Sequence, residues 1–260
     1  MARNTYDEET AAAFKASREI PRDGLLEWRE AIRRHLHLTP AMALLDIGAG
    51  TGAFAAAFAD WFGVRVVAVE PSAAMRAHIP RAPGIEVVEG DATVLPLPDE
   101  SADGAWLSLV IHHVLDLAAA AHEIRRVLRP GAPVLIRQGF PDRYEPAGSL
   151  KQDGIELIRW FPETARTANT FPSLAETCAA FATAGFRQEA IEQVRDIRAG
   201  SLEDFLGQVD RLRRADTTMR NLTEHEFLRG KERLRRAVRQ ADRRGGAEPR
   251  SNWLDLLVLR

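Results

Sequence analysis

The sequence predicts a doubly wound α/β fold with a mostly parallel, seven-stranded sheet, an N-terminal helical cap and helical insertions. Between residues 41 and 140, short and nearly continuous apolar runs alternate with helical segments. This alternation is typical of a parallel sheet that helices cover on both faces. A turn with three alternating glycines follows the first run, a sixth strand is expected at 186–194, and an apolar run at 253–259 predicts the last strand.

The first forty residues predict the helical cap. Residues 7–17 are rich in alanine and glutamate, and residues 24–36 repeat apolar side chains at spacings of three and four. Both patterns favour helices, and the second gives its helix one apolar face. We therefore assign residues 1–40 to the cap and residues 41–260 to the main domain.

The strands and helices of the main domain follow from the same patterns. Strands are expected at 42–47, 64–69, 85–89 and 105–110, with a fifth starting at Val134. The connecting helices are expected at 53–62, 72–78 and 117–128, the second with Ser72 as its N-cap. After residue 140 the pattern loosens, and helices are expected at 149–160, at 174–184, from about Ser201 and from about Thr223. Insertions at about 141–170 and 200–250 therefore interrupt the domain.

Composition limits the possible classes of protein. The chain has 260 residues with 45% hydrophobic side chains, enough for one large domain or one domain with a cap. It holds no apolar run of the roughly 18 residues that span a membrane, so we expect no membrane insertion and a cytoplasmic protein. A net charge of -2 argues against a nucleic-acid partner. The arginines of residues 211–250 fit the solvated face of a helix.

The glycine turn marks the expected binding site. Gly48, Gly50 and Gly52 separate a buried strand from a helix, and glycine allows the positive φ that brings backbone N–H groups to a ligand. Glu70 lies about 20 residues further on, at the end of the second strand, as in dinucleotide-binding proteins. By itself the turn does not separate NAD from other adenosine ligands.

Two acidic positions favour one of these ligands. Asp46 stands two residues before the first glycine, where a carboxylate would repel a pyrophosphate but suit a cation. S-Adenosylmethionine carries an ammonium and a sulfonium group and has no phosphate. Asp91 follows the third strand, where a carboxylate can accept a hydrogen bond from an adenine amino group. Both positions favour S-adenosylmethionine over NAD.

Five motifs in order resemble those of the class I S-adenosylmethionine-dependent methyltransferases. They are Asp46-Ile47-Gly48-Ala49-Gly50-Thr51-Gly52, Glu70-Pro71-Ser72, Gly90-Asp91-Ala92, the segment 107–116 and Leu128-Arg129-Pro130-Gly131. The similarity covers about residues 41–140 and is greatest to the small-molecule enzymes of the ubiquinone and menaquinone biosynthesis group. It implies a Rossmann-like methyltransferase fold and S-adenosylmethionine as the cofactor, with S-adenosylhomocysteine as the product.

The resemblance also implies roles for individual residues. The backbone of Gly48, Ala49, Gly50 and Gly52 would hold the methionine and ribose part, with Asp46 facing the amino group. Glu70, followed by Pro71, would bind the ribose hydroxyls. Asp91 and Ala92 would flank the adenine, and Ser108 would contact the methionine part. Tyr6 and Arg18 of the cap are further cofactor-binding candidates, Arg18 for the carboxylate.

A catalytic base is optional for methyl transfer, because the sulfonium already activates the methyl carbon. His112, His113 and Asp116 follow the fourth strand, and His113 or Asp116 could take a proton from the acceptor. A purely structural role for the two histidines is the alternative. Adjacent histidines point in different directions, so no metal site is expected.

The sequence does not identify the acceptor beyond a small organic molecule. Arg159, Trp160 and Phe161 could line a partly aromatic acceptor pocket, or could belong to a helix that packs on the domain. An NAD-dependent oxidoreductase is disfavoured, because neither Tyr6 nor Tyr144 is followed four residues later by lysine. A non-catalytic S-adenosylmethionine-binding regulator stays open, and so does a homodimer.

Overall fold

The structure is a computed structural model, and it describes residues 7–18, 22–143, 156–199, 201–242 and 250–260. Seven strands form one sheet in the order β3-β2-β1-β4-β5-β7-β6. Their bounds are Ala43–Ile47 for β1, Arg65–Val69 for β2, Ile85–Val88 for β3, Gly104–Ser108 for β4, Val134–Gln138 for β5, Gln188–Ala199 for β6 and Arg250–Leu259 for β7.

The sheet confirms the predicted fold. All pairs among β1 to β5 are parallel, and β7 lies antiparallel between β5 and β6. From β1 the chain proceeds to β2 and β3 on one side and then crosses to β4 on the other. The carboxyl ends of β1 and β4 therefore border the crevice where open α/β sheets bind ligands.

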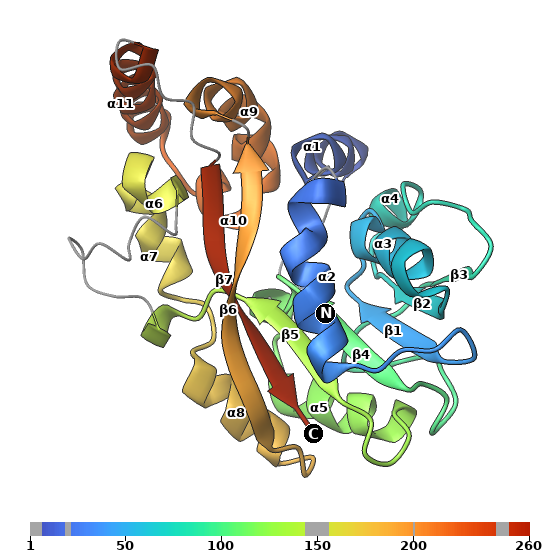
Figure 1. Ribbon diagram of the computed structural model, residues 1–260. Helices are drawn as coiled ribbons and strands as arrows, with labels where there is room; N and C mark the ends of the chain where they lie inside the picture. The colour runs from blue at the N-terminus through green and yellow to red at the C-terminus, as the bar shows by residue number, and fades with distance from the viewer. Residues whose placement is uncertain (1–6, 19–21, 144–155, 200, 243–249) are drawn as a thin grey trace.

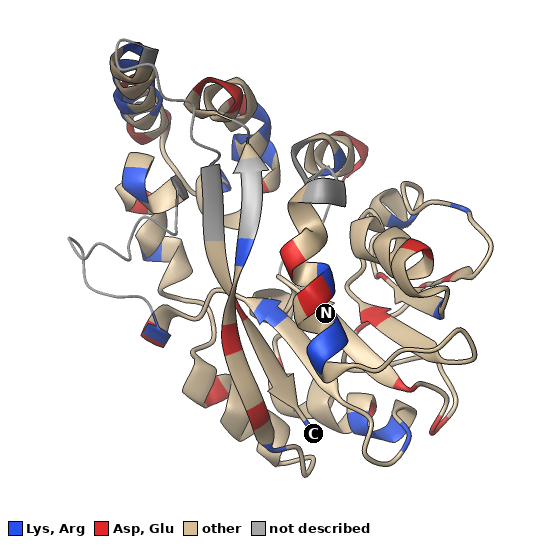
Figure 2. Cartoon of the chain, viewed as in Figure 1, with Lys and Arg blue, Asp and Glu red and all other residues tan. Residues whose placement is uncertain are grey.

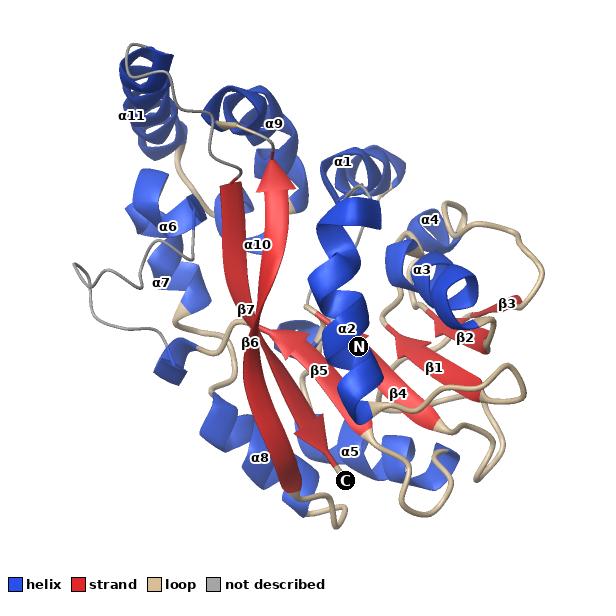
Figure 3. Cartoon of the chain, in the orientation of Figure 1, coloured by secondary structure: helices blue, strands red, loops and turns tan. Residues whose placement is uncertain are grey.

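Helices cover both faces of the sheet (Figure 3). One core combines Trp28 of α2 (Leu26–His35) and Phe58 of α3 (Ala53–Phe62) with side chains of the sheet. The core of the opposite face contains Ile124 of α5 (Leu117–Val127) and Phe181 of α8 (Leu174–Ala182). The other α-helices of the described residues are α1 (Glu8–Arg18), α4 (Ala73–Arg76), α6 (Glu156–Trp160), α7 (Ala165–Ala168), α9 (Leu202–Ala215), α10 (Thr217–Arg220) and α11 (Glu224–Asp242).

Some boundaries differ from the predictions. The fourth strand ends at Ser108 instead of residue 110, because Leu109 takes a positive φ of 54° that an extended strand cannot contain. The last two strands are longer than predicted and form a twisted pair that extends past the rest of the sheet (Figure 1). Of the helix predicted at 149–160, the described part is α6. Within the described residues, no helix is long and apolar enough to cross a membrane.

Helices α6, α9, α10 and α11 form a core of their own beside the outer half of the β6–β7 pair (Figure 1). Phe161 is fully buried in it and stacks on Phe227 of α11, with ring centroids 5.8 Å apart. Trp160 belongs to the same core. Both side chains therefore pack within a core of helices, which favours the packing alternative over an aromatic acceptor pocket.

Charge on these outer helices is mixed. Helix α11 carries several arginines together with a few acidic residues (Figure 2), and Glu232 accepts hydrogen bonds from Arg236 and Arg239. Glu226 pairs with Arg166 of α7. Such pairs fit a solvated helix surface, as the sequence predicted.

Helix α1 lies between the outer helices and the glycine turn. It packs against α9 and α4, and Arg214 of α9 forms a 2.8 Å ion pair with its Glu9. A Cβ built on Gly50 would lie 3.4 Å from the ring of Phe14. The N-terminal segment thus reaches the part of the domain where a ligand is expected.

Candidate functional site

The glycine turn between β1 and α3 has the conformation that its sequence predicts. Gly48, Gly50 and Gly52 have φ values of 67°, 57° and 80°, which residues other than glycine rarely adopt. The N–H groups of Gly48 and Ala49 donate to the carbonyl of Val69 at 2.8 and 3.1 Å, which fixes the turn to the end of β2. The turn thus brings backbone amides to the N-terminus of α3, an arrangement that suits a polar ligand.

Gly48 is also required by a close neighbour. The positive φ of Leu109 turns the chain after β4, and the side chain of Val110 then covers Gly48. A Cβ on Gly48 would lie 2.3 Å from Cγ2 of Val110, well inside van der Waals contact. The turns after β1 and β4 are therefore fitted to each other.

We predict that Gly48→Ala destabilises the protein by about 1–3 kcal/mol, because it adds backbone strain and a steric clash. Gly185→Ala is the matched control, since Gly185 has a φ of 82° but nothing within 4 Å of an added Cβ. Urea denaturation and calorimetry with S-adenosylhomocysteine measure the effects. Both variants should lose stability, but only Gly48→Ala should weaken binding; equal effects would contradict the fitted turns.

Glu70 ties the glycine turn to the segment after β2. Its side chain is 6% exposed, and its two oxygens accept from the N–H groups of Gly50 and Ser72, each at 2.9 Å. Arg76 donates to the carbonyls of Glu70 and Pro71 and pairs with Glu89. Burial raises the pKa of Glu70 above its ordinary value, although the two N–H donors and Arg76 oppose that change.

Asp46 is a second buried carboxylate, below the glycine turn. It is 2% exposed and receives a hydrogen bond from the backbone of Ala55 in the first turn of α3. Burial and the neighbouring carboxylate of Glu70 raise its pKa to about 7. Within the described part of the chain, its Oδ2 is buried and accepts no hydrogen bond. A buried acceptor without a hydrogen bond destabilises the folded protein unless a ligand donates to it.

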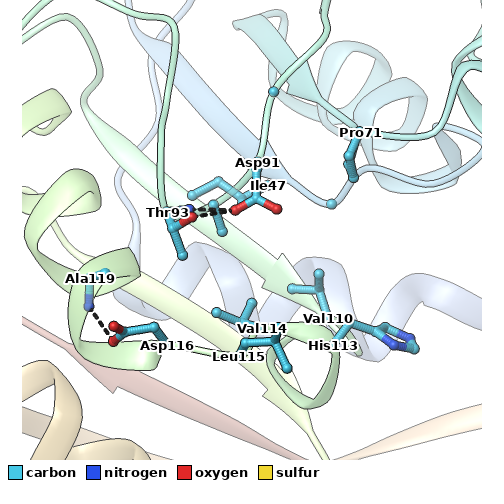
Figure 4. A pocket seen from close by; sticks show the side chains of 13 residues that line it. Ile47, Pro71, Asp91, Thr93, Val110, His113, Val114, Leu115, Asp116 and Ala119 are labelled. Atoms are coloured by element: carbon cyan, nitrogen blue, oxygen red, sulfur yellow. Dashed lines mark hydrogen bonds between the residues drawn. The ribbon is translucent and has the colours of Figure 1, made fainter. Parts of the chain in front are cut away.

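A cavity of about 310 Å³ lies at the carboxyl ends of β1, β3 and β4. In Figure 4, Ile47, Pro71 and Asp91 face Val110, Val114 and Leu115 across it. The full lining consists of Ile47, Gly48, Pro71, Gly90, Asp91, Ala92, Thr93, Val110, His113, Val114, Leu115, Asp116 and Ala119. Most of this surface is apolar, with acidic groups at Asp91 and Asp116.

The acidic residues of the lining have local partners. Oδ1 of Asp91 accepts from the N–H and the hydroxyl of Thr93 at 2.9 and 2.6 Å (Figure 4). Partial burial raises the pKa of Asp91, and the two hydrogen bonds from Thr93 lower it. Together the hydrogen bonds outweigh burial, so the pKa of Asp91 lies below its ordinary value. Asp116 is the N-cap of α5 and accepts from the N–H of Ala119 at 2.8 Å.

The structure brings only some of the predicted site residues to the cavity. Gly48, Pro71, Asp91, Ala92, His113 and Asp116 line it. The other predicted residues do not line the cavity. They belong to the glycine turn or lie at the ends of the adjacent strands, and they are Asp46, Ala49, Gly50, Gly52, Glu70 and Ser108. Tyr6 lies outside the described residues, and so does the side chain of Arg18, which ends α1.

The two adjacent histidines occupy different environments. His112 is 7% exposed, and its ring stacks on Phe171, with centroids 4.1 Å apart. His113 lines the cavity. Of the two histidines, His113 is therefore the one beside the cavity, and the other candidate base, Asp116, also lines it.

The apolar lining residues Val110, Val114 and Leu115 were not among the predicted site residues, although they lie in the motif at 107–116. A signal was present, because this segment is apolar beyond the end of a strand. Leu115 lines the cavity and remains 59% exposed.

Fold and site together define an α/β protein that binds an adenosyl cofactor at the topological switch point of its sheet, between the carboxyl ends of β1 and β4. A family model described as "Methyltransferase domain" matches residues 45–136. A demethylmenaquinone methyltransferase of Streptomyces avermitilis is 30% identical over 173 residues, which are 65% of this chain and 72% of that protein. The chain belongs to the S-adenosylmethionine-dependent methyltransferases and resembles the menaquinone and ubiquinone group.

Other comparisons agree with this assignment. A demethylmenaquinone methyltransferase of Renibacterium salmoninarum is 30% identical over 147 residues, and the match spans 56% of this chain and only 61% of that relative. The fold is similar to the crystal structure described as a methyltransferase from an antibiotic biosynthesis pathway of Anabaena variabilis, with a TM-score of 0.71 and 22% identity. That match covers 90% of this chain and 97% of the other.

The residues of the site fit S-adenosylmethionine. The glycine turn offers backbone groups where a Cβ would collide, and the buried Oδ2 of Asp46 needs a donor or a cation. A pyrophosphate is a poor match, since Asp46 and Glu70 both lie at the turn that would hold it. The same carboxylates would instead stabilise a cationic ligand.

Proposed function

We propose that this protein transfers the methyl group of S-adenosylmethionine to an oxygen, nitrogen or carbon nucleophile of a small organic molecule by in-line displacement. The buried carboxylate pair of Asp46 and Glu70, beside the cavity at the glycine turn, is the observation that carries the proposal. The bound cofactor supplies an activated methyl group on a sulfonium.

The chain itself has to bind, orient and exclude water. The glycine turn and Glu70 hold the ribose and methionine part, and Asp91 and Ala92 flank the adenine. The apolar side chains of Ile47, Val110 and Val114 keep water from the cavity, which strengthens electrostatic interactions inside it. The insertions at about 141–170 and 200–250 form a lid on the acceptor side, and the packing of α1 on α9 connects the N-terminal cap to the second insertion.

Binding and turnover tests separate this function from its alternatives. Calorimetry should detect S-adenosylhomocysteine but not NADH, and binding of NADH alone would favour an oxidoreductase. Incubation with methyl-labelled S-adenosylmethionine and extracts of the source cells should label a small molecule. Tight binding without any labelled product would favour a non-catalytic binding protein. Demethylmenaquinone is the first pure acceptor to assay, because the similar proteins are demethylmenaquinone methyltransferases.

If the acceptor loses a proton during transfer, His113 is the base that we expect to accept it. His113→Asn should then lower the single-turnover rate by about 100-fold or more near pH 7, since general bases contribute on this scale. Affinity for S-adenosylhomocysteine should change little. His112→Asn is the paired comparison, and we expect a loss of stability from the weakened stack on Phe171 with a smaller effect on rate. An unchanged rate in His113→Asn would leave His113 a purely structural role.

A further inference from the structure

Arg137 is a buried cation at the carboxyl end of β5 that the sequence did not mark as functional. It is 2% exposed, and its Nη1 donates to Oγ of Ser108 at the end of β4, at 3.1 Å. Its guanidinium lies 4.9 Å from the ring of Trp28 in α2 and 5.5 Å from the ring of Phe54 in α3. Phe54 is the second residue of α3, directly after the glycine turn.

Arg137 and Asp46 lie on the same face of the sheet. Side chains alternate along strands, and Leu44 and Leu135, two residues before each, share one core with Trp106. Strand β4 separates β1 from β5, so the two backbones are about 10 Å apart. The long side chain of Arg137 can cover much of this separation toward the glycine turn.

The charges of this pair match those of an α-amino acid. Asp46 presents a buried oxygen that accepts no hydrogen bond within the described residues, and Arg137 presents a cation near the N-terminus of α3, where backbone N–H groups also favour an anion. The methionine part of the cofactor carries an ammonium and a carboxylate on one carbon. We propose that Arg137, positioned by Ser108, binds the carboxylate of the cofactor while Asp46 faces its ammonium.

This inference rests on the proposed function and replaces Arg18 with Arg137 as the carboxylate-binding residue. It predicts that the contribution of Arg137 depends on the presence of that carboxylate. The test compares S-adenosylhomocysteine with its decarboxylated analogue, in which a 3-aminopropyl group on sulfur keeps the ammonium. Calorimetry of both ligands needs no acceptor and no turnover.

Arg137→Gln should weaken binding of S-adenosylhomocysteine by roughly 10- to 100-fold, as expected for a charge-assisted hydrogen bond, and binding of the analogue by less than about 3-fold. Ser108→Ala should show the same selectivity with a smaller loss. Arg125→Gln is the control, because Arg125 also lies over an aromatic ring, 3.6 Å from the centroid of Phe186, but on α5.

Equal losses for the two ligands in Arg137→Gln, or no loss for either, would overturn the inference and leave Arg137 as a packing residue. If Arg137→Gln does not fold, the selectivity of Ser108→Ala decides the question. If the unaltered protein binds neither ligand, the proposed function itself fails. The two failures are therefore distinguishable.

Discussion

Glu70→Ala should weaken binding of S-adenosylhomocysteine by about 1–3 kcal/mol, a roughly 5- to 150-fold rise in Kd. The carboxylate accepts hydrogen bonds from Gly50 and Ser72, so its removal leaves both N–H groups without their acceptor. The glycine turn and the start of α4 then lose their common anchor. Calorimetry on the purified variant measures the effect, and unchanged affinity would remove Glu70 from the site.

Glu89→Ala is the matched control for Glu70→Ala. Glu89 follows β3 as Glu70 follows β2, but its side chain is 74% exposed and pairs only at the surface with Arg76. Exposed pairs of this kind contribute little, so binding should be nearly unchanged.

A ligand without the ribose hydroxyls separates two roles of Glu70. If the carboxylate binds the ribose diol, the loss in Glu70→Ala should shrink with the 2′,3′-dideoxy form of S-adenosylhomocysteine. If Glu70 only fixes the turn, both ligands should lose affinity equally.

Much of the fold could be predicted because local signals and tertiary structure agree. The apolar runs mark the strands, and the side chain of Ser72 caps α4 as expected. The end of β4 could not be predicted, because a leucine gives no sign of the left-handed conformation that Leu109 adopts. The positive φ of Leu109 accompanies the close approach of Val110 to Gly48, a contact between distant parts of the chain.

The conformation of the glycine turn could be predicted from the spacing of its glycines, whereas the burial of residues that depend on distant helices could not be predicted. In the sequence, Arg137 is only a charged residue at the end of an apolar run. Its burial depends on Trp28 and Phe54, which are more than eighty residues away in the chain and meet it only through the packing of α2 and α3 on the sheet. Phe161 illustrates the converse, since its aromatic character fits a pocket and a helix core equally well.

Asp46→Asn should change how stability depends on pH. The pKa of Asp46 is about 7 in the folded protein and 3.8 as its ordinary value, a difference of about 3 units. Between these values the folded state keeps a proton that the unfolded state has lost, so the free energy of unfolding falls as pH rises from about 4 to about 7. At about 1.4 kcal/mol per unit the fall is about 4 kcal/mol. Urea denaturation over this range should show it, and Asp46→Asn should lack it.

The same group should couple binding to pH. A cationic ligand binds better when Asp46 is ionised. As the pH rises toward about 7, the Kd of S-adenosylhomocysteine should therefore fall by up to about tenfold per pH unit, and above about pH 7 it should stay constant. A proton should be released on binding, which calorimetry in buffers of different ionisation enthalpy detects. 5′-Methylthioadenosine, which has no ammonium, should bind without this dependence, and so should either ligand to Asp46→Asn. A pH-independent Kd for S-adenosylhomocysteine would mean that the ammonium does not face Asp46, whose buried Oδ2 accepts no hydrogen bond within the described residues.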